Sequence, residues 1–185
     1  MNRDEALALL REHVKNENMI KHCLASEAVL RALAARLGRD PEKWALAGLL
    51  HDIDAELTGG DILRHTHEAA RLLREKGLPE DLVEAVLLHN EAAHPGRSRT
   101  DAFHTALAAG ETVTGLIMAT AMVYPDRKVA SVKPSSVIKR MKDKRFAASV
   151  NRDTIRECEK LGLTLEQFVE LCLDAMKGVS AELGL

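Results

Sequence analysis

Residues 45–56 read Ala-Leu-Ala-Gly-Leu-Leu-His-Asp-Ile-Asp-Ala-Glu, a dense apolar run that ends in polar residues. Such a run is typical of the end of a buried helix, which would carry His51, Asp52 and Asp54 into the interior. Burying unpaired polar groups costs roughly 2 kcal/mol or more each. A bound metal ion would satisfy all three side chains. The simpler alternative is a helix end with a hydrogen-bonded core histidine.

Composition indicates an all-α protein. The chain has 185 residues, with 3% aromatic residues, abundant Ala and Leu, and almost no runs of β-branched residues. This length suits a single domain, which we expect to span residues 1–185. The net charge of −2 argues against a nucleic-acid polymer as the partner.

The sequence also bears on the cellular compartment. We find no apolar run of the roughly 18 residues needed to cross a bilayer, and Met1–Lys15 is charged and amphipathic, without a signal-peptide core. These features predict a soluble, cytoplasmic protein with no membrane partner. The cysteines lie in helical patterns without Cys-x-x-Cys spacing, so we interpret them as reduced packing residues: Cys23, Cys158 and Cys172.

Caps, glycines and prolines divide the chain into helices. The expected ranges are 3–14, 19–37, a helix opened by Asp40-Pro41 and carrying His51 and Asp52, 62–77, 79–91, 100–123 with Thr100 as its cap, 151–161, and 164–183 with a Thr164/Gln167 capping box. Residues 92–99 are expected to form a loop. The core motifs fall within residues 19–123, and the basic segment 126–145 and the helices of 151–183 are expected to pack on that core.

Histidines and acids recur on separate expected helices, in five stretches. These are Lys21-His22, Leu49–Asp54, His65 four residues before Ala69-Ala70, Leu88-His89-Asn90-Glu91, and Gly110–Leu116 with Glu111 inside it. The combined spacing resembles the HD-domain superfamily, and especially its small stand-alone members of HDIG type. The resemblance implies an all-α HD-domain helical bundle.

The resemblance also implies a ligand set. His22, His51, Asp52 and the late acid Glu111 would hold one divalent metal, and His65 and His89 would complete a second site bridged by Asp52. Neutral imidazoles with carboxylates suit Mn²⁺, Fe²⁺, Co²⁺, Ni²⁺ or Zn²⁺, whereas a calcium site needs more oxygens. The cofactor is therefore expected to be one or two transition-metal ions.

Glu111 departs from the family pattern, in which the late ligand is usually Asp. Its extra methylene moves the carboxylate by about one bond length, more than the ~0.2 Å tolerance of a metal site. Either Glu111 binds metal with an altered geometry, or the site is weakened or degenerate. His13, His67, His94 and His104 lie off the pattern and are interpreted as surface or packing histidines.

Residues 126–145 form a basic segment with eight Lys or Arg and two acids, a local charge of +6 that leaves −8 for the remainder. One interpretation is a solvated charged face. The other is a funnel that draws a phosphate to the metal cleft, with Lys139, Lys142, Lys144 and Arg145 as substrate-binding residues. For catalysis the candidates are Asp52, Asp54 and Lys144, with Asp54 also a candidate for orienting a ligand imidazole.

Three functions fit this sequence. The resemblance most often implies a metal-dependent phosphohydrolase for a small phosphoester or nucleotide. An HD-fold diiron oxygenase would need the same ligands, and a non-catalytic binding domain would fit a degenerate site. The sequence leaves the oligomeric state open, including a homo-oligomer.

Overall fold

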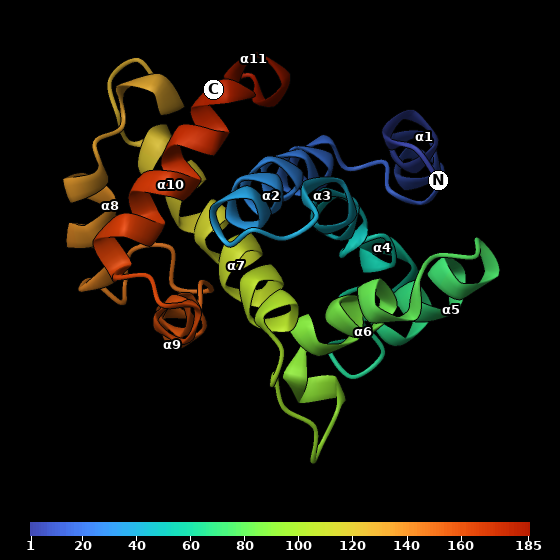
Figure 1. Cartoon of the computed structure of the whole chain (residues 1–185). Helices are drawn as coiled ribbons and strands as arrows, with labels where there is room; N and C mark the ends of the chain where they lie inside the picture. Colours follow the sequence, from blue (N-terminus) through green and yellow to red (C-terminus); the bar gives the residue numbers. More distant parts are fainter.

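Helix α7 (Ala102–Met122) runs through the middle of the molecule beside α2 (Glu17–Arg36) in the computed structural model, which describes residues 1–185 (Figure 1). The remaining α-helices are α1 (Arg3–His13), α3 (Pro41–Leu50), α4 (Ala55–Thr58), α5 (His67–Glu75), α6 (Glu80–His89), α8 (Pro134–Met141), α9 (Arg152–Arg156), α10 (Leu165–Gly178) and α11 (Ser180–Leu183). Short 3-10 helices are η1 (Glu91–Ala93), η2 (Val129–Ser131) and η3 (Glu157–Leu161). The chain contains no strand, which confirms the all-α prediction.

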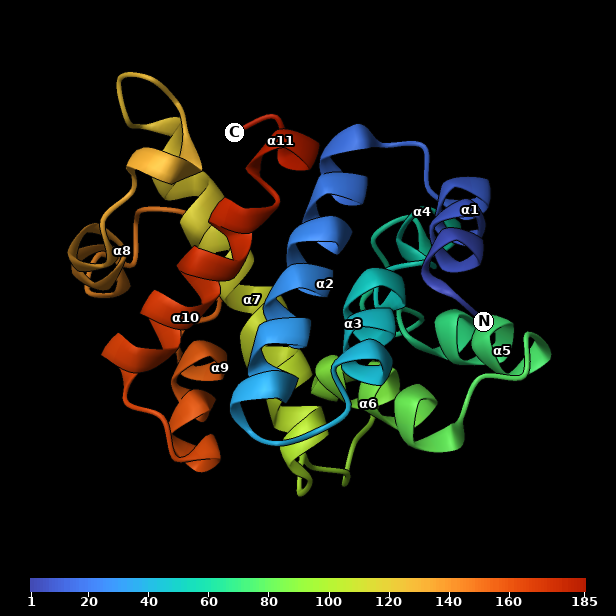
Figure 2. The same cartoon turned by 45° about the horizontal axis from the view of Figure 1, so that its top comes forward.

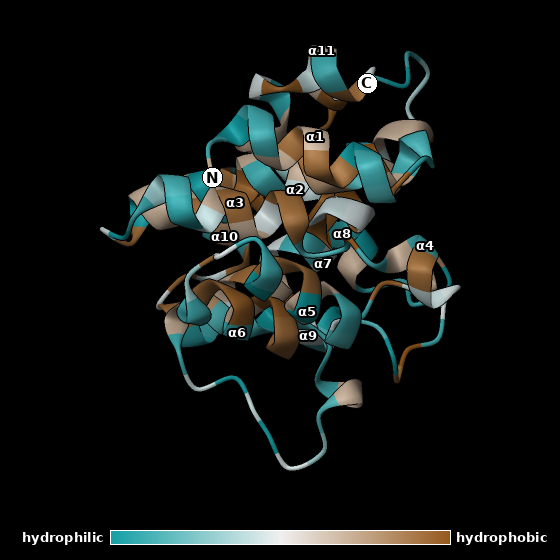
Figure 3. Ribbon diagram, turned by 90° about the vertical axis from the view of Figure 1, so that its right-hand side faces the viewer, coloured by the Kyte–Doolittle hydropathy of each residue, from teal (hydrophilic) through white to brown (hydrophobic).

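Other helices pack on both sides of the α2–α7 pair. Helices α1, α3, α4, α5 and α6 lie to one side, and α8, α9 and α10 lie to the other (Figures 1 and 2). Apolar side chains from both sides join one buried core that reaches from Ala6 to Leu183. Figure 3 shows apolar segments gathered toward the centre, with polar residues frequent along the outer helices and loops.

The contact between α2 and α3 is unusually close. A Cβ atom added at Gly48 would lie 2.5 Å from the backbone oxygen of Ser26, so only glycine fits there. Asp40 caps α3 through the N–H groups of Glu42 and Lys43, and Pro41 is its first residue, as the sequence predicts. This tight crossing fixes the end of α3, where His51 and Asp52 lie.

Several expected boundaries differ from the structure. The helix expected over 62–77 begins only at His67, because Thr66 has a positive φ of 80° and its N–H donates to the buried carboxylate of Asp54. His65 therefore lies on a turn. Asp101, not Thr100, caps α7. The range 151–161 divides into α9 and η3, and 164–183 into α10 and α11, while the Thr164/Gln167 capping box is confirmed.

Helix α7 also corrects the prediction about apolar runs. Over 21 residues it is long and apolar enough to cross a membrane by length and composition. Yet 67% of its most apolar window is buried inside the molecule, where α2 and α6 pack against it. Its apolar character is that of a central core helix, and it carries Glu111.

Candidate metal centre

Six predicted ligands converge from five parts of the fold. His22 lies in the second turn of α2, and His51 and Asp52 directly follow α3. His65 lies on the turn before α5 and His89 is the last residue of α6, while Glu111 lies in the middle of α7. Helix ends and the turn before α5 supply most of this set, namely His51, Asp52, His65 and His89.

Asp52 lies between two pairs of histidines. Its Oδ2 is 3.3 Å from His51 Nε2 and 3.6 Å from His22 Nε2. Its other oxygen, Oδ1, is 3.2 Å from His65 Nε2 and 3.5 Å from His89 Nε2. The two groups His22–His51–Asp52 and Asp52–His65–His89 each place three donor atoms close enough to hold one ion, and Asp52 is common to both.

The far nitrogen of every histidine in the cluster has an acceptor. Nδ1 of His51 donates to the Gly48 carbonyl at 2.8 Å, and Nδ1 of His89 donates to the Val86 carbonyl at 2.7 Å. Nδ1 of His65 donates to Asp54 Oδ1 at 2.7 Å. In its neutral form, with the proton on Nδ1, each ring would direct the lone pair of Nε2 toward Asp52.

His22 is oriented by a longer chain of contacts. The Thr114 hydroxyl donates to the Glu111 carbonyl at 2.7 Å and accepts from His22 Nδ1 at 2.9 Å.

The facing lone pairs fit a cation. Nε2 of His22 lies 3.1 Å from Nε2 of His51, and Nε2 of His65 lies 3.1 Å from Nε2 of His89. Two such lone pairs repel each other unless a proton or a metal ion lies between them. Imidazole nitrogens with a carboxylate form a donor set that transition metals prefer. The residues present therefore fit one or two divalent transition metals.

Electrostatics inside the cluster separates the histidines. Burial, together with the charge of His51, lowers the pKa of His22 to about 4, and burial lowers the pKa of His89. Burial also opposes the charged form of His65, but hydrogen bonds to Asp52 and Asp54 outweigh it and raise its pKa to about 10. For Asp52, the charge and hydrogen bonds of the histidines overcome burial and hold the pKa well below its ordinary value.

Glu111 lies at the edge of the first group. Its Oε2 is 3.6 Å from His22 Nε2, and its Oε1 accepts a hydrogen bond from the Thr112 hydroxyl. Burial raises the pKa of Glu111 to about 7. The longer side chain thus still reaches the cluster beside His22, although Glu111 is not among the three closest donors of either group.

A family model described as the HD domain matches residues 19–115, more than half of the chain and a range that includes all six predicted ligands. The chain belongs to the HD-domain family. This membership confirms the resemblance drawn from the sequence at the level of the superfamily. The narrower likeness to HDIG-type members stays a prediction.

Curated relatives of this HD domain are ribonucleases Y. The chain is 30% identical over 80 residues to ribonuclease Y of Opitutus terrae, 33% over 84 residues to that of Nitratidesulfovibrio vulgaris, and 32% over 83 residues to that of Thermotoga maritima. Each alignment covers 43% of this chain and only 15–16% of the relative. The comparison with solved structures found no match.

Asp54 does not occupy the position expected of a residue that acts directly in catalysis. Its side chain is fully buried, and its Oδ2 accepts the backbone N–H groups of Thr66 and Ala69 at 2.8 and 2.9 Å. Its other oxygen holds His65. With both oxygens occupied and no exposure, Asp54 is a positioning residue behind His65, and the expectation that it acts directly in catalysis is revised.

Three positioning residues escape sequence reasoning. Thr114 orients His22 across 92 residues of sequence, and Asn90 donates to the carbonyls of Ile62 and His65. Arg99 donates to the Leu88 carbonyl at 2.9 Å, next to His89, and pairs with Glu157. The position of Asn90 directly after the ligand histidine was a usable signal. Nothing local marks Thr114 or Arg99.

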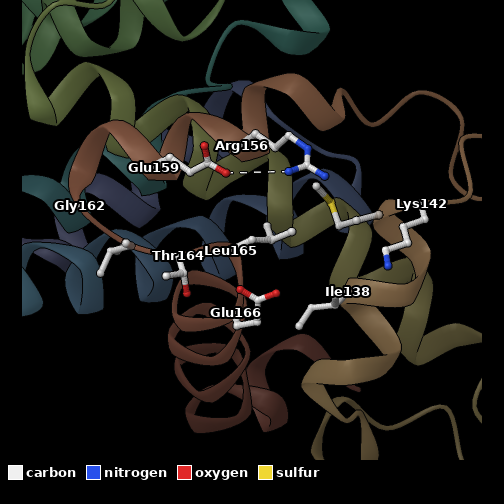
Figure 4. Close-up of a pocket in the computed structure, with 10 residues that line it drawn as sticks. Ile138, Lys142, Arg156, Glu159, Gly162, Thr164, Leu165 and Glu166 are labelled. Carbon is white, nitrogen blue, oxygen red and sulfur yellow. Dashed lines mark ion pairs between the residues drawn. The ribbon is translucent and has the colours of Figure 1, made fainter.

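The predicted basic residues lie apart from the metal ligands in the contacts that the structure records. Lys139, Lys142, Lys144 and Arg145 are exposed on and after α8. Lys142 lines a hollow of about 510 Å³ between α8, η3 and the start of α10, where Arg156, Glu159 and Glu166 also lie (Figure 4). No metal ligand lines this hollow. Cations and acids are mixed there, so it has no single charge preference.

Proposed function

We propose that the protein is a metal-dependent phosphohydrolase acting on a small phosphorylated substrate. The observation that carries this proposal is the division of the two histidine pairs between the two oxygens of Asp52. Family membership supports the coarser statement, a metal-dependent HD hydrolase. A divalent cation bound there would lower the pKa of water toward about 7 and offset negative charge on the phosphoryl group.

The residues of the chain itself have defined tasks in this proposal. Asp52 would share its two oxygens between two ions, which is possible because a carboxylate offers more than one lone-pair direction. The Nδ1 acceptors Gly48, Val86, Asp54 and Thr114 would hold the imidazoles in one tautomer. No protein nucleophile is needed, because water attacks directly.

The metal would be Mn²⁺, Fe²⁺, Co²⁺, Ni²⁺ or Zn²⁺, since all of these bind imidazole and carboxylate donors. Lys144 and its basic neighbours would attract the substrate by long-range charge. That role does not require contact with the metal ligands.

RNA is a second candidate substrate, favoured by the likeness to ribonuclease Y across 43% of the chain. The reacting group would then be a phosphodiester. The net charge of −2 disfavours binding of a long nucleic-acid polymer, so we rank RNA below a small phosphoester.

The test uses protein loaded with Mn²⁺ and then with each of the other metals. We expect release of p-nitrophenol from p-nitrophenyl phosphate at equal rates with and without oxygen, and loss of that activity in Asp52→Asn with its fold retained. Strict dependence on oxygen would contradict the proposal and favour the diiron oxygenase. Metal binding without turnover of this ester, a nucleotide panel or a short RNA would favour a non-catalytic domain.

A further inference from the structure

A second hollow lies where the start of α2, the last turns of α7 and the C-terminal residues meet. It measures about 440 Å³, within the usual range for small-ligand pockets. Its lining includes Asn18 and Lys21 from α2, Met118 and Met122 from α7, Arg127 and Leu185. Figure 2 shows α11 and the C-terminus beside the start of α2.

The register of the two helices places this pocket next to the metal centre. Asn18 lies one turn before His22 on α2, and Met118 lies one turn after Thr114 on α7. His22 and Thr114 are themselves hydrogen-bonded at 2.9 Å. Because one helical turn rises about 5.4 Å, the pocket begins about that far from the His22–Thr114 contact.

One side of α7 runs from Glu111 toward the pocket. Glu111, Gly115, Met118 and Met122 recur on one side of the helix and are partly or fully accessible to solvent. Their neighbours Val113, Leu116, Ile117, Thr120 and Ala121 are buried. A molecule whose phosphate lies beside Glu111 would reach the pocket along this side of α7 by passing Val150, whose side chain would lie 3.4 Å from a Cβ added at Gly115.

Two cations line the pocket without an ion pair to an acidic side chain. Lys21 is half-buried, makes no ion pair or side-chain hydrogen bond, and extends its ammonium toward Gly184, where an added Cβ would lie 3.1 Å from Nζ. Arg127 is likewise without an acidic partner, and its φ of 53° is uncommon for a residue other than glycine. A half-buried ammonium favours an anionic partner.

We propose that this pocket binds the body of the substrate, a small phosphoester with an apolar ring and a second anionic group that pairs with Lys21 and Arg127. The proposal rests on the proposed function, because the reacting phosphate is assigned to the metal centre. Met118, Met122 and Leu185 would surround the ring, and thioether side chains adapt readily to the shape of a ligand. The two cations would then select substrates whose leaving group is charged.

The first test measures binding without turnover. The ligand is naphthalene-2-sulfonate, an apolar ring with one anionic group that cannot be hydrolysed as a phosphoester. It is dialysed to equilibrium against the metal-free chain of 185 residues. We expect one binding site, and a Kd about tenfold higher in Lys21→Met, which removes a charge-assisted contact. Ala119→Leu, which fills the pocket from α7, is expected to weaken binding at least as much. The matched control Lys76→Met removes an exposed, unpaired lysine and is expected to bind like wild type.

The second test measures turnover in the metal-loaded protein. Phenyl phosphate and 4-carboxyphenyl phosphate differ only in a second anionic group, and we expect Lys21→Met to lower the preference for the carboxylated ester about tenfold. The proposed pocket would be ruled out if both Lys21→Met and Ala119→Leu bound naphthalene-2-sulfonate like wild type and kept the wild-type preference for the carboxylated ester. Failure of the wild type to hydrolyse either ester would instead count against the proposed function, while the dialysis still decides whether the pocket binds the anionic ring.

Discussion

Asp54 supports the second histidine pair, His65 and His89. Its buried carboxylate accepts hydrogen bonds from His65 and from two backbone N–H groups. Changing Asp54 to Asn replaces one oxygen with an NH₂ group that faces a donor. We expect metal affinity to fall about 10–100-fold and the unfolding free energy to fall by about 1–3 kcal/mol. Metal titration and urea unfolding measure the two effects. Asp61→Asn is the control. Asp61 is exposed and accepts one hydrogen bond from a backbone N–H, which the amide oxygen of an asparagine can also accept. Equal affinities in both variants would contradict this role.

Thr114 offers a test of the contact to His22. Thr114→Val keeps the shape but removes the acceptor of His22 Nδ1, whereas Thr114→Ser retains the hydroxyl. We expect about tenfold weaker metal binding in the valine variant and little change in the serine variant. Isothermal titration with Mn²⁺ separates the two. If both variants bind like wild type, the hydroxyl does not orient His22.

At the residue scale, the candidate metal-binding side chains were easier to predict from the sequence than the residues that orient them. The predicted histidine ligands stand out because each lies at the end of an apolar helix pattern or within a stretch that resembles the HD-domain superfamily. Thr114 is an ordinary threonine in an apolar helix, and its partner is 92 positions away. Asp54 was visible as a polar residue in an apolar run, but only the structure shows that it faces away from the open side of the cluster.

Among the elements, the crossing of α2 and α3 governs the position of His51 and Asp52. Gly48→Ala would place a methyl group 2.5 Å from the Ser26 oxygen, which the backbone can relieve only by moving the helices apart. We expect a loss of at least about 3 kcal/mol, at the upper end of overpacking costs. Gly178→Ala in α10 meets nothing within 4 Å and is expected to stay within about 1 kcal/mol of wild type. Urea unfolding compares them, and similar stabilities would rule out a tight crossing.

The pairing of Arg99 with Glu157 joins the end of α6 to η3 and responds to pH. Burial opposes the charged form of Glu157, but hydrogen bonds from Arg99 and Lys160 prevail and lower its pKa. Because the folded pKa lies below the unfolded value of about 4.3, this contribution is present above that pH and is lost as the pH falls through the folded pKa. We therefore expect wild type to lose more stability than Glu157→Gln between pH 5 and pH 3. Glu159→Gln, at an exposed site, is expected to follow wild type; an identical pH slope in Glu157→Gln would refute the contribution.

Most helices were predictable from caps, prolines and periodicity, and the clearest failure has a physical cause in a distant contact. Residues 62–66 carry a helix-like pattern, but the carboxylate of Asp54 takes the Thr66 N–H and the chain turns instead. Local sequence could not supply this contact. The break at Val179 and the 3-10 geometry of η3 have no signal in the local sequence either.

For the whole molecule, α2 and α7 bring together ligands from both ends of a 90-residue span and leave one side of α7 partly accessible. Residues 139–145 of the basic segment lie on the other flank with α8, whereas Arg127 of the same segment lines the proposed substrate pocket. Long-range attraction and substrate contact are therefore assigned to different parts of this segment. This division was not predictable, because charge patterning along the sequence does not report which face of a bundle a segment covers. We therefore expect Lys144→Ala to weaken the dependence of kcat/KM on salt concentration and to leave kcat nearly unchanged.

The number of metal ions bound per chain tests the central claim most directly. Each variant is loaded with Mn²⁺ in the absence of oxygen, freed of unbound metal and measured by elemental analysis. We expect two ions per chain in wild type, one in His65→Ala, one in His22→Ala and none in Asp52→Ala. This series follows from the placement of the two histidine pairs on opposite oxygens of Asp52. One ion in wild type that persists unchanged in His65→Ala would contradict a shared two-metal centre.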